Sequence, residues 1–151
     1  MNVIEQRLEF LGISLPQPAK PVANYVPWVK SGNLIFLAGQ LPMKDGTVQN
    51  TGPIDGGVAS IEAAKLCGIN LLAQLREACD GDLMRVKQIV KLVVFAQCTD
   101  YTANIPFAAN GASDLMVAAF GDKGKHARSS IGVSALPLNA MVEVEAIVEI
   151  E

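Results

Sequence analysis

Residues 127–150 have the sequence ARSSIGVSALPLNAMVEVEAIVEI, the strongest fold signal in the chain. Two β-rich runs, 127–136 and 141–150, flank Pro137, Leu138 and Asn139, and this pattern predicts a closing β-hairpin. Side chains alternate between the two faces of a strand, so one face of the last run must belong to the core. That apolar face consists of Val142, Val144, Ala146, Val148 and Ile150, and the opposite face carries Glu143, Glu145 and Glu149 with Met141 and Ile147.

The first of these two runs places Arg128, Ser130, Gly132 and Ser134 on one face. We expect Arg128 and the glutamates to lie on the sheet face away from the core, where a solvated surface is the ordinary interpretation. This face also carries serine, glycine, methionine and isoleucine. It is therefore not polar enough for a fully solvated surface and not apolar enough for a core face. The composition suits an interface between copies of the chain that holds a few polar groups.

Hydrophobic periodicity predicts the elements just upstream. Residues 58–79 contain no proline and keep an apolar stripe, which is typical of a helix. Residues 86–97 are rich in β-branched side chains and predict a buried central strand. A second helix is expected at 105–120, although Gly111 weakens its first turns, and residues 121–124 end it.

Turn residues organise the N-terminal part. Asn2 and Glu5 match a capping box at the start of a short helix, and the proline-rich segment 15–21 follows it as an extended connector. Strands are expected at 25–30 and 34–40, joined by a Ser-Gly-Asn turn, with another turn at 44–46.

This order of elements predicts an α+β fold, with a mixed sheet and two main helices packed on one of its faces. We expect one domain over 1–151, made of an N-terminal helix and connector (1–22) and a core (23–151). The second face of the sheet then needs a cover, and a homo-oligomer whose sheets meet would supply it.

Composition excludes several classes of function. The chain has 151 residues, of which 50% are hydrophobic and 18% charged, and its net charge of -3 disfavours nucleic-acid binding. Three cysteines without a CxxC pair indicate a reducing compartment, and polar residues interrupt the first segment, so we expect a cytoplasmic protein without signal peptide or membrane span.

Sequence motifs for bound groups are also missing. A single histidine, His126, and cysteines without ligand spacing predict no metal site. No glycine-rich loop matches a dinucleotide site, and no Gly-x-Ser-x-Gly elbow presents a nucleophile. We therefore expect no cofactor.

The remaining chemistry centres on Arg128 and Glu143. An arginine fork binds a small carboxylate through two parallel hydrogen bonds, and a nearby glutamate can take a proton from water. Other roles stay open: Arg128 could tie subunits together by pairing with Glu143 or Asp114, Tyr25 could serve only hairpin packing, and Asn110 could cap a helix.

Two motifs carry a resemblance to a known family. Residues 127–131, 136–137 and 142–147 look like the C-terminal signature of the RidA family, also called YjgF. Residues 25–26, 31–35 and 38–42 are similar to that family's N-terminal hairpin, so the resemblance spans Tyr25 to Ile150 and leaves the first helix as an extension.

The resemblance implies a chorismate-mutase-like fold and a homotrimer whose sheets line an inner barrel, with clefts between subunits. It also implies cofactor-independent hydrolysis of reactive enamines and imines of 2-oxo acids, with release of ammonia. Carried over to this sequence, Arg128 would bind the substrate carboxylate, Glu143 would activate water and Tyr25 of a neighbouring subunit would line the cleft. Asn110 is similar to a family asparagine.

The sequence departs from the family at two site positions. Ser130 stands where many members have cysteine, and Ala38 where many have serine or threonine. Both changes remove polar or nucleophilic character, which leaves room for a different substrate. The N-terminal helix and longer loops indicate a divergent branch of the family. They leave open a second function, a small-carboxylate-binding or regulatory trimer without catalysis. The name endoribonuclease L-PSP is also attached to the family, but the few basic residues and single histidine offer no acid-base pair for RNA cleavage.

Overall fold

The computed structural model describes residues 1–21, 23–101 and 104–151. The helices are α1 (Val3–Phe10), α2 (Val58–Ala78) and α3 (Ile105–Phe120), with short 3₁₀ turns at Leu83–Arg85, Gly121–Gly124 and Pro137–Asn139. The strands are β1 (Trp28–Ser31), β2 (Leu34–Gln40), β3 (Met43–Lys44), β4 (Thr47–Val48), β5 (Val86–Gln97), β6 (Ala127–Val133) and β7 (Val142–Ile150).

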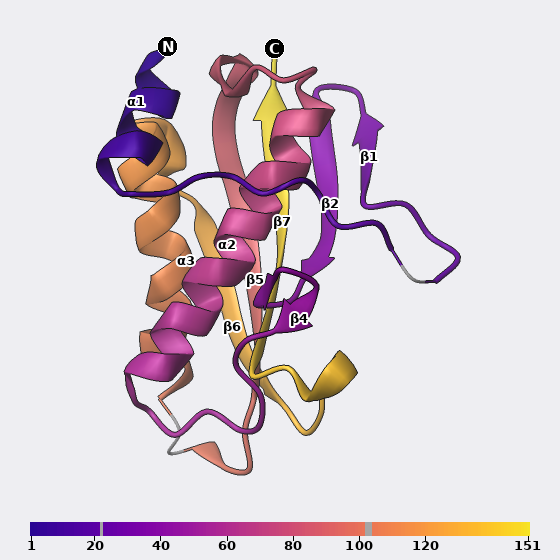
Figure 1. Cartoon of the computed structure of the whole chain (residues 1–151), viewed down its shortest axis with the longest axis vertical. Coiled ribbons are helices and arrows are strands. Elements are labelled where there is room, and N and C mark those ends of the chain that lie inside the picture. Colours follow the sequence, from indigo (N-terminus) through magenta and orange to yellow (C-terminus); the bar gives the residue numbers. More distant parts are fainter. Residues whose placement is uncertain (22, 102–103) are drawn as a thin grey trace.

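The main sheet has the order β1-β2-β7-β5-β6, and β3 and β4 form a separate two-stranded ribbon. Figure 1 shows α2 and α3 lying side by side across one face of this sheet. All its pairs are antiparallel except β5 and β6, which run parallel. The predicted α+β fold, with a mixed sheet and two helices on one face, is therefore confirmed.

The predicted closing hairpin is wrong. β6 and β7 follow each other in the sequence, but β5 lies between them and pairs with both. The apolar alternation of β7 and the β-branched run of β5 suit the middle of a sheet, whereas the polar residues of β6 suit an edge. The connection through Pro137–Asn139 turns on two left-handed residues, Leu138 (φ 55°) and Asn139 (φ 57°), and carries the chain across β5.

The predicted N-terminal hairpin is confirmed with a later start. β1 begins at Trp28, after Pro27, instead of at Tyr25. Ser31 pairs with Leu34, so the turn consists of Gly32, which has a φ of 61°, and Asn33.

α2 and α3 approach each other closely at Gly111. A Cβ atom on Gly111 would overlap the main-chain oxygen of Ile61 in α2 and lie 3.1 Å from the amide nitrogen of Lys65. The glycine that weakens α3 as an isolated helix is thus the residue that lets the two helices pack. Gly68 of α2 faces Leu115 at the same interface.

The N-terminal segment is fixed to the helical layer. The capping box of α1 is confirmed, with the Asn2 side chain accepting from the amides of Ile4 and Glu5. Arg7 donates to the main-chain oxygen of Ala119 in α3 over 3.2 Å. Further along, Gln74 of α2 is buried and donates to the main-chain oxygen of Ala19 over 2.7 Å, which anchors the connector on α2.

α2 is long and apolar enough, by length and composition alone, to cross a membrane. However, 56% of its apolar window is buried inside the fold. Its inward face packs on α3, β2 and β7, which is the pattern of a core helix. The three thiols are free; Cys67 and Cys79 are buried in the core, and Cys98 is partly exposed.

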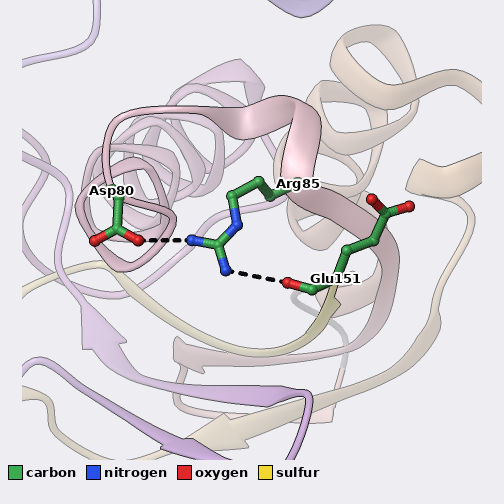
Figure 2. A network of polar contacts seen from close by, with 3 residues as sticks. All are labelled: Asp80, Arg85 and Glu151. Carbon is green, nitrogen blue, oxygen red and sulfur yellow. Dashed lines mark hydrogen bonds and ion pairs between the residues drawn. The ribbon is translucent and has the colours of Figure 1, made fainter.

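A small polar network lies where β5 begins and β7 ends, next to Glu151. Figure 2 shows Arg85 between Asp80 and Glu151. One terminal nitrogen of Arg85 lies 2.7 Å from Asp80 Oδ2, and the other donates to the Glu151 main-chain oxygen over 3.0 Å. Both ends of this guanidinium are therefore used for structure.

The sheet face opposite the helices is only partly covered. Three of its large apolar side chains are strongly exposed: Val29 (52%), Phe36 (43%) and Ile131 (46%). Phe36 pairs with Ile147 across β2 and β7, so apolar groups from neighbouring strands adjoin on this face. Such a patch is typical of a contact surface.

Candidate active site

Glu143 lies at the start of β7 and borders a cavity of about 350 Å³. Its neighbours in the strand, Val142 and Val144, are buried on the helix side, so alternation turns Glu143 to the other face of the sheet. The cavity is formed by the proline-rich connector, the end of β2 and the 137–139 turn, with Tyr25, Gly39 and Leu138 among its lining residues.

The backbone of β2 passes against the Glu143 carboxyl group. A Cβ atom on Gly39 would lie 2.8 Å from both Cδ and Oε2 of Glu143. A β-bulge between Leu37 and Gln40 brings this part of β2 out of register with β7. Glycine leaves room for the carboxylate in its present position, and close approach of this kind is a common reason for glycine in a strand.

The Glu143 carboxyl group makes no hydrogen bond or ion pair with any residue in the described ranges. Burial raises its pKa above the usual range, and the negative charge of Glu145 adds to the increase. A half-buried carboxylate with a raised pKa beside an apolar cavity holds a proton more readily than an exposed one and can exchange it with a bound molecule.

Arg128 lies on the edge strand β6 and reaches toward α3. Its Nη1 donates to Asn110 Oδ1 over 2.8 Å and to Ser113 Oγ over 3.2 Å. Its other nitrogens, Nε and Nη2, bond to no residue that the structure describes, whereas both terminal nitrogens of Arg85 are bonded. One edge of the Arg128 fork is thus available for a planar anion such as a carboxylate.

Arg128 and Glu143 lie on opposite sides of the sheet, contrary to the expectation that they share a face. Arg128 pairs with Leu92 and Ser130 with Val94, and both partners are fully buried under the helices. Glu143 points to the uncovered side. The assumed hairpin caused this error, because it placed β6 and β7 next to each other.

The other predicted site residues divide between these two places. Tyr25 is 54% exposed and borders the Glu143 cavity of the same chain. Ala38 precedes Gly39, is partly buried, and donates its amide to the main-chain oxygen of Pro27. Asn110 and Ser130 lie with Arg128.

Asn110 is bound to Arg128 inside α3 and is therefore not a helix cap; the residue before α3 is Asn104. The Ser130 Oγ atom is buried and has no hydrogen-bond partner in the described part of the chain. A buried hydroxyl without a partner is costly for the fold.

Sequence reasoning missed several residues at both places. Gly39, Leu138 and Asn70 contribute to the Glu143 cavity, and Ser113 and His126 lie beside Arg128. The Ala-Gly-Gln segment of the N-terminal hairpin was a usable signal for Gly39. Nothing local marks Ser113, because its role depends on packing between α3 and β6.

No group of three or more His, Cys, Asp or Glu side chains that could hold a metal occurs in the described residues. Among the same residues, Arg128 forms no ion pair with Glu143 or Asp114.

The five-stranded mixed sheet with two long helices on one face defines an α+β fold of the chorismate-mutase-like type. The family model described as "YjgF/chorismate_mutase-like, putative endoribonuclease" matches residues 5–150, starting inside α1. On this evidence the chain belongs to the YjgF family, also called RidA.

Similar proteins support this assignment. The chain is 41% identical over 151 residues to Protein TCP17 of Trypanosoma cruzi, covering 97% of this chain and 94% of that protein. It is 31% identical to a 2-iminobutanoate/2-iminopropanoate deaminase of Dermatophagoides farinae, covering 92% and 95%. A solved protein of unknown function from Agrobacterium tumefaciens superposes with a TM-score of 0.92 at 42% identity, covering 99% of this chain and 93% of that one.

Proposed function

We propose that the protein hydrolyses imines and enamines of 2-oxo acids and releases ammonia, in a cleft where two copies of the chain meet. The Glu143 carboxylate, which has no partner among the described residues and borders an apolar cavity, is the observation that carries this proposal. The similar Dermatophagoides farinae protein, named as a deaminase of such imines, supports the substrate class.

The site residues suit each step of such a reaction. Arg128 binds the substrate carboxylate through the free edge of its guanidinium, as an arginine fork allows. Glu143 takes a proton from water while the water oxygen bonds to the C=N carbon, and the electron pair of the broken π bond moves to nitrogen. Glu143 delivers this proton to the nitrogen, the second water proton follows it there as the C=O bond forms, and cleavage of the C–N bond releases ammonia and leaves the 2-oxo acid.

A second copy is needed because the two groups lie on opposite sides of the sheet in one chain. We infer a homotrimer in which Glu143 and Tyr25 of one copy meet Arg128 of another, with the sheets forming an inner barrel. The exposed Val29, Phe36 and Ile131 on the open sheet face support contact between copies. The three free thiols support a reducing compartment, and we place the protein in the cytoplasm.

Ammonia release from imines generated in situ by an amino acid oxidase tests the activity. Glu143→Gln should lower the rate by about 10²- to 10⁴-fold, the usual contribution of a general base. Glu149→Gln is the matched control, because Glu149 lies on the same strand and face but outside the cavity. If wild type is no faster than buffer, the hydrolase proposal is wrong.

Mixing two inactive variants tests the shared cleft. Arg128→Ala and Glu143→Gln chains are refolded together, so that about a quarter of the clefts would receive an intact Arg128 and an intact Glu143 from different copies. Recovery of about that fraction of the wild-type rate is expected. No recovery would show that the two residues do not act across a subunit boundary.

Calorimetry with 2-oxobutanoate separates catalysis from binding alone. Binding that requires Arg128, without any ammonia release, would favour the small-carboxylate binder over the hydrolase. Degradation of RNA by purified wild type that persists after contaminating nucleases are removed would favour the endoribonuclease instead.

A further inference from the structure

A chain of hydrogen bonds links Arg128 to the turn after α3. Ser113 of α3 lies between Arg128 and His126, with its Oγ atom 3.2 Å from Arg128 Nη1 and 2.8 Å from His126 Nε2. His126 Nδ1 lies 2.7 Å from the main-chain oxygen of Gly124. These three side chains are all partly buried between α3 and β6.

With a neutral His126 ring, each of these hydrogen bonds has one direction. A carbonyl oxygen can only accept, so His126 Nδ1 carries the hydrogen that it donates to Gly124. In the neutral ring Nε2 is then the acceptor, and Ser113 donates its only hydrogen to it. The lone pairs of Ser113 remain for Arg128, which can only donate.

The Gly124 end of this series of hydrogen bonds is held rigidly. Gly124 is buried, and a Cβ atom there would overlap the main-chain oxygen of Met116 in α3. The carbonyl that orients His126 therefore belongs to a turn packed tightly on the same helix that carries Ser113. Positions fixed in this way can orient a functional side chain through its hydrogen bonds.

We propose that Ser113 and His126 are positioning residues that set the Arg128 fork for the substrate carboxylate; this rests on the proposed function. Ser113 and Asn110 together occupy Nη1, which leaves Nε and Nη2 as the edge that can grip a carboxylate. His126 acts one step further away, by taking the Ser113 hydrogen so that the hydroxyl presents an acceptor to Arg128.

The test measures KM and kcat for ammonia release, and the dissociation constant of 2-oxobutanoate by calorimetry. Ser113→Ala should raise KM and the dissociation constant about tenfold, the effect of one lost hydrogen bond to a charged group, with kcat within about threefold of wild type. His126→Leu should act in the same direction. His126→Gln, which keeps an acceptor of similar reach, should restore most of the affinity.

Ser14→Ala is the matched control, because Ser14 is an exposed serine after α1, outside the Glu143 cavity, and should change nothing. Wild-type values for both Ser113→Ala and His126→Leu would overturn the inference and leave the proposed function intact. An equal rise in KM and in the dissociation constant for His126→Leu and His126→Gln would also overturn it. So would a fall in kcat together with a loss of thermal stability, because a merely structural role predicts either pattern. If Ser113→Ala does not fold, the two His126 variants decide.

The two proposals fail separately. If wild type binds 2-oxobutanoate but releases no ammonia, hydrolysis is wrong and the dissociation constants of the same variants decide the positioning role. If wild type neither binds 2-oxobutanoate nor hydrolyses imines, both proposals are wrong.

Discussion

Replacing Gly39 by alanine should damage catalysis while sparing the fold. The new Cβ atom would lie 2.8 Å from Cδ and Oε2 of Glu143, and ordinary contact begins at 3.4 Å, so the carboxylate must retreat by about 0.6 Å. The backbone at Gly39 has no left-handed φ, so alanine introduces no backbone strain. The obstructing atoms are the flexible end of a side chain, which can move at little cost.

We therefore expect a change in unfolding free energy within about 1 kcal/mol, because the side chain moves and no core is disrupted. The rate of ammonia release should fall by roughly 10- to 100-fold, since a displacement of this order at a reacting group is costly. Thermal unfolding and steady-state kinetics measure the two effects on the same preparation.

A double-mutant cycle shows whether Gly39 acts through Glu143. In the Glu143→Gln background the Gly39→Ala change should have little further effect on the rate, because the catalytic carboxylate is already gone. Full activity of Gly39→Ala would refute the assigned role of the close contact. An equal loss of rate in both backgrounds would refute it as well, and unfolding of the variant would show that the contact is structural.

Three further predictions concern stability. The raised pKa of Glu143 contributes stability that is fully present below the ordinary carboxyl pKa and is lost as the pH rises through the raised pKa of the folded state. At higher pH the half-buried carboxylate is ionised, which destabilises the fold. The melting temperature of Glu143→Gln should therefore be higher than that of wild type near pH 8 and equal to it near pH 4. Gly111→Ala forces a Cβ atom into the Ile61 main chain and should cost about 3 kcal/mol or more in urea unfolding; a cost below about 0.5 kcal/mol would contradict the close helix contact. Asp80→Asn breaks the ion pair with Arg85, but the Asp80 side chain is 89% exposed, so the melting temperature should change by the equivalent of less than about 1 kcal/mol, and less still at high salt.

Much of the local structure was predictable because it depends on neighbours in the chain. The apolar periodicity of 58–79 and 105–120 matches α2 and α3, and the alternation in 142–150 matches β7. The capping box at Asn2 needs only residues within one turn of helix.

Pairing between strands was not predictable in the same way. Alternation shows which residues of a strand share a face but says nothing about which strand lies beside it. Strands that follow each other in the sequence often form hairpins, and this preference predicted β6 beside β7. Because β5 lies between them, Arg128 was assigned to the wrong face of the sheet.

The sequence alone determined the family motifs, the two helices and the importance of Arg128 and Glu143 as candidates, because each of these is written in residue types and short spacings. Only the tertiary structure decided that these two residues lie on opposite sides of one sheet, that the Gly39 backbone passes close to the Glu143 carboxylate, and that Ser113 bonds to both Arg128 and His126. These relations join residues far apart in the chain, and they arise only when strand order and helix packing bring the residues together.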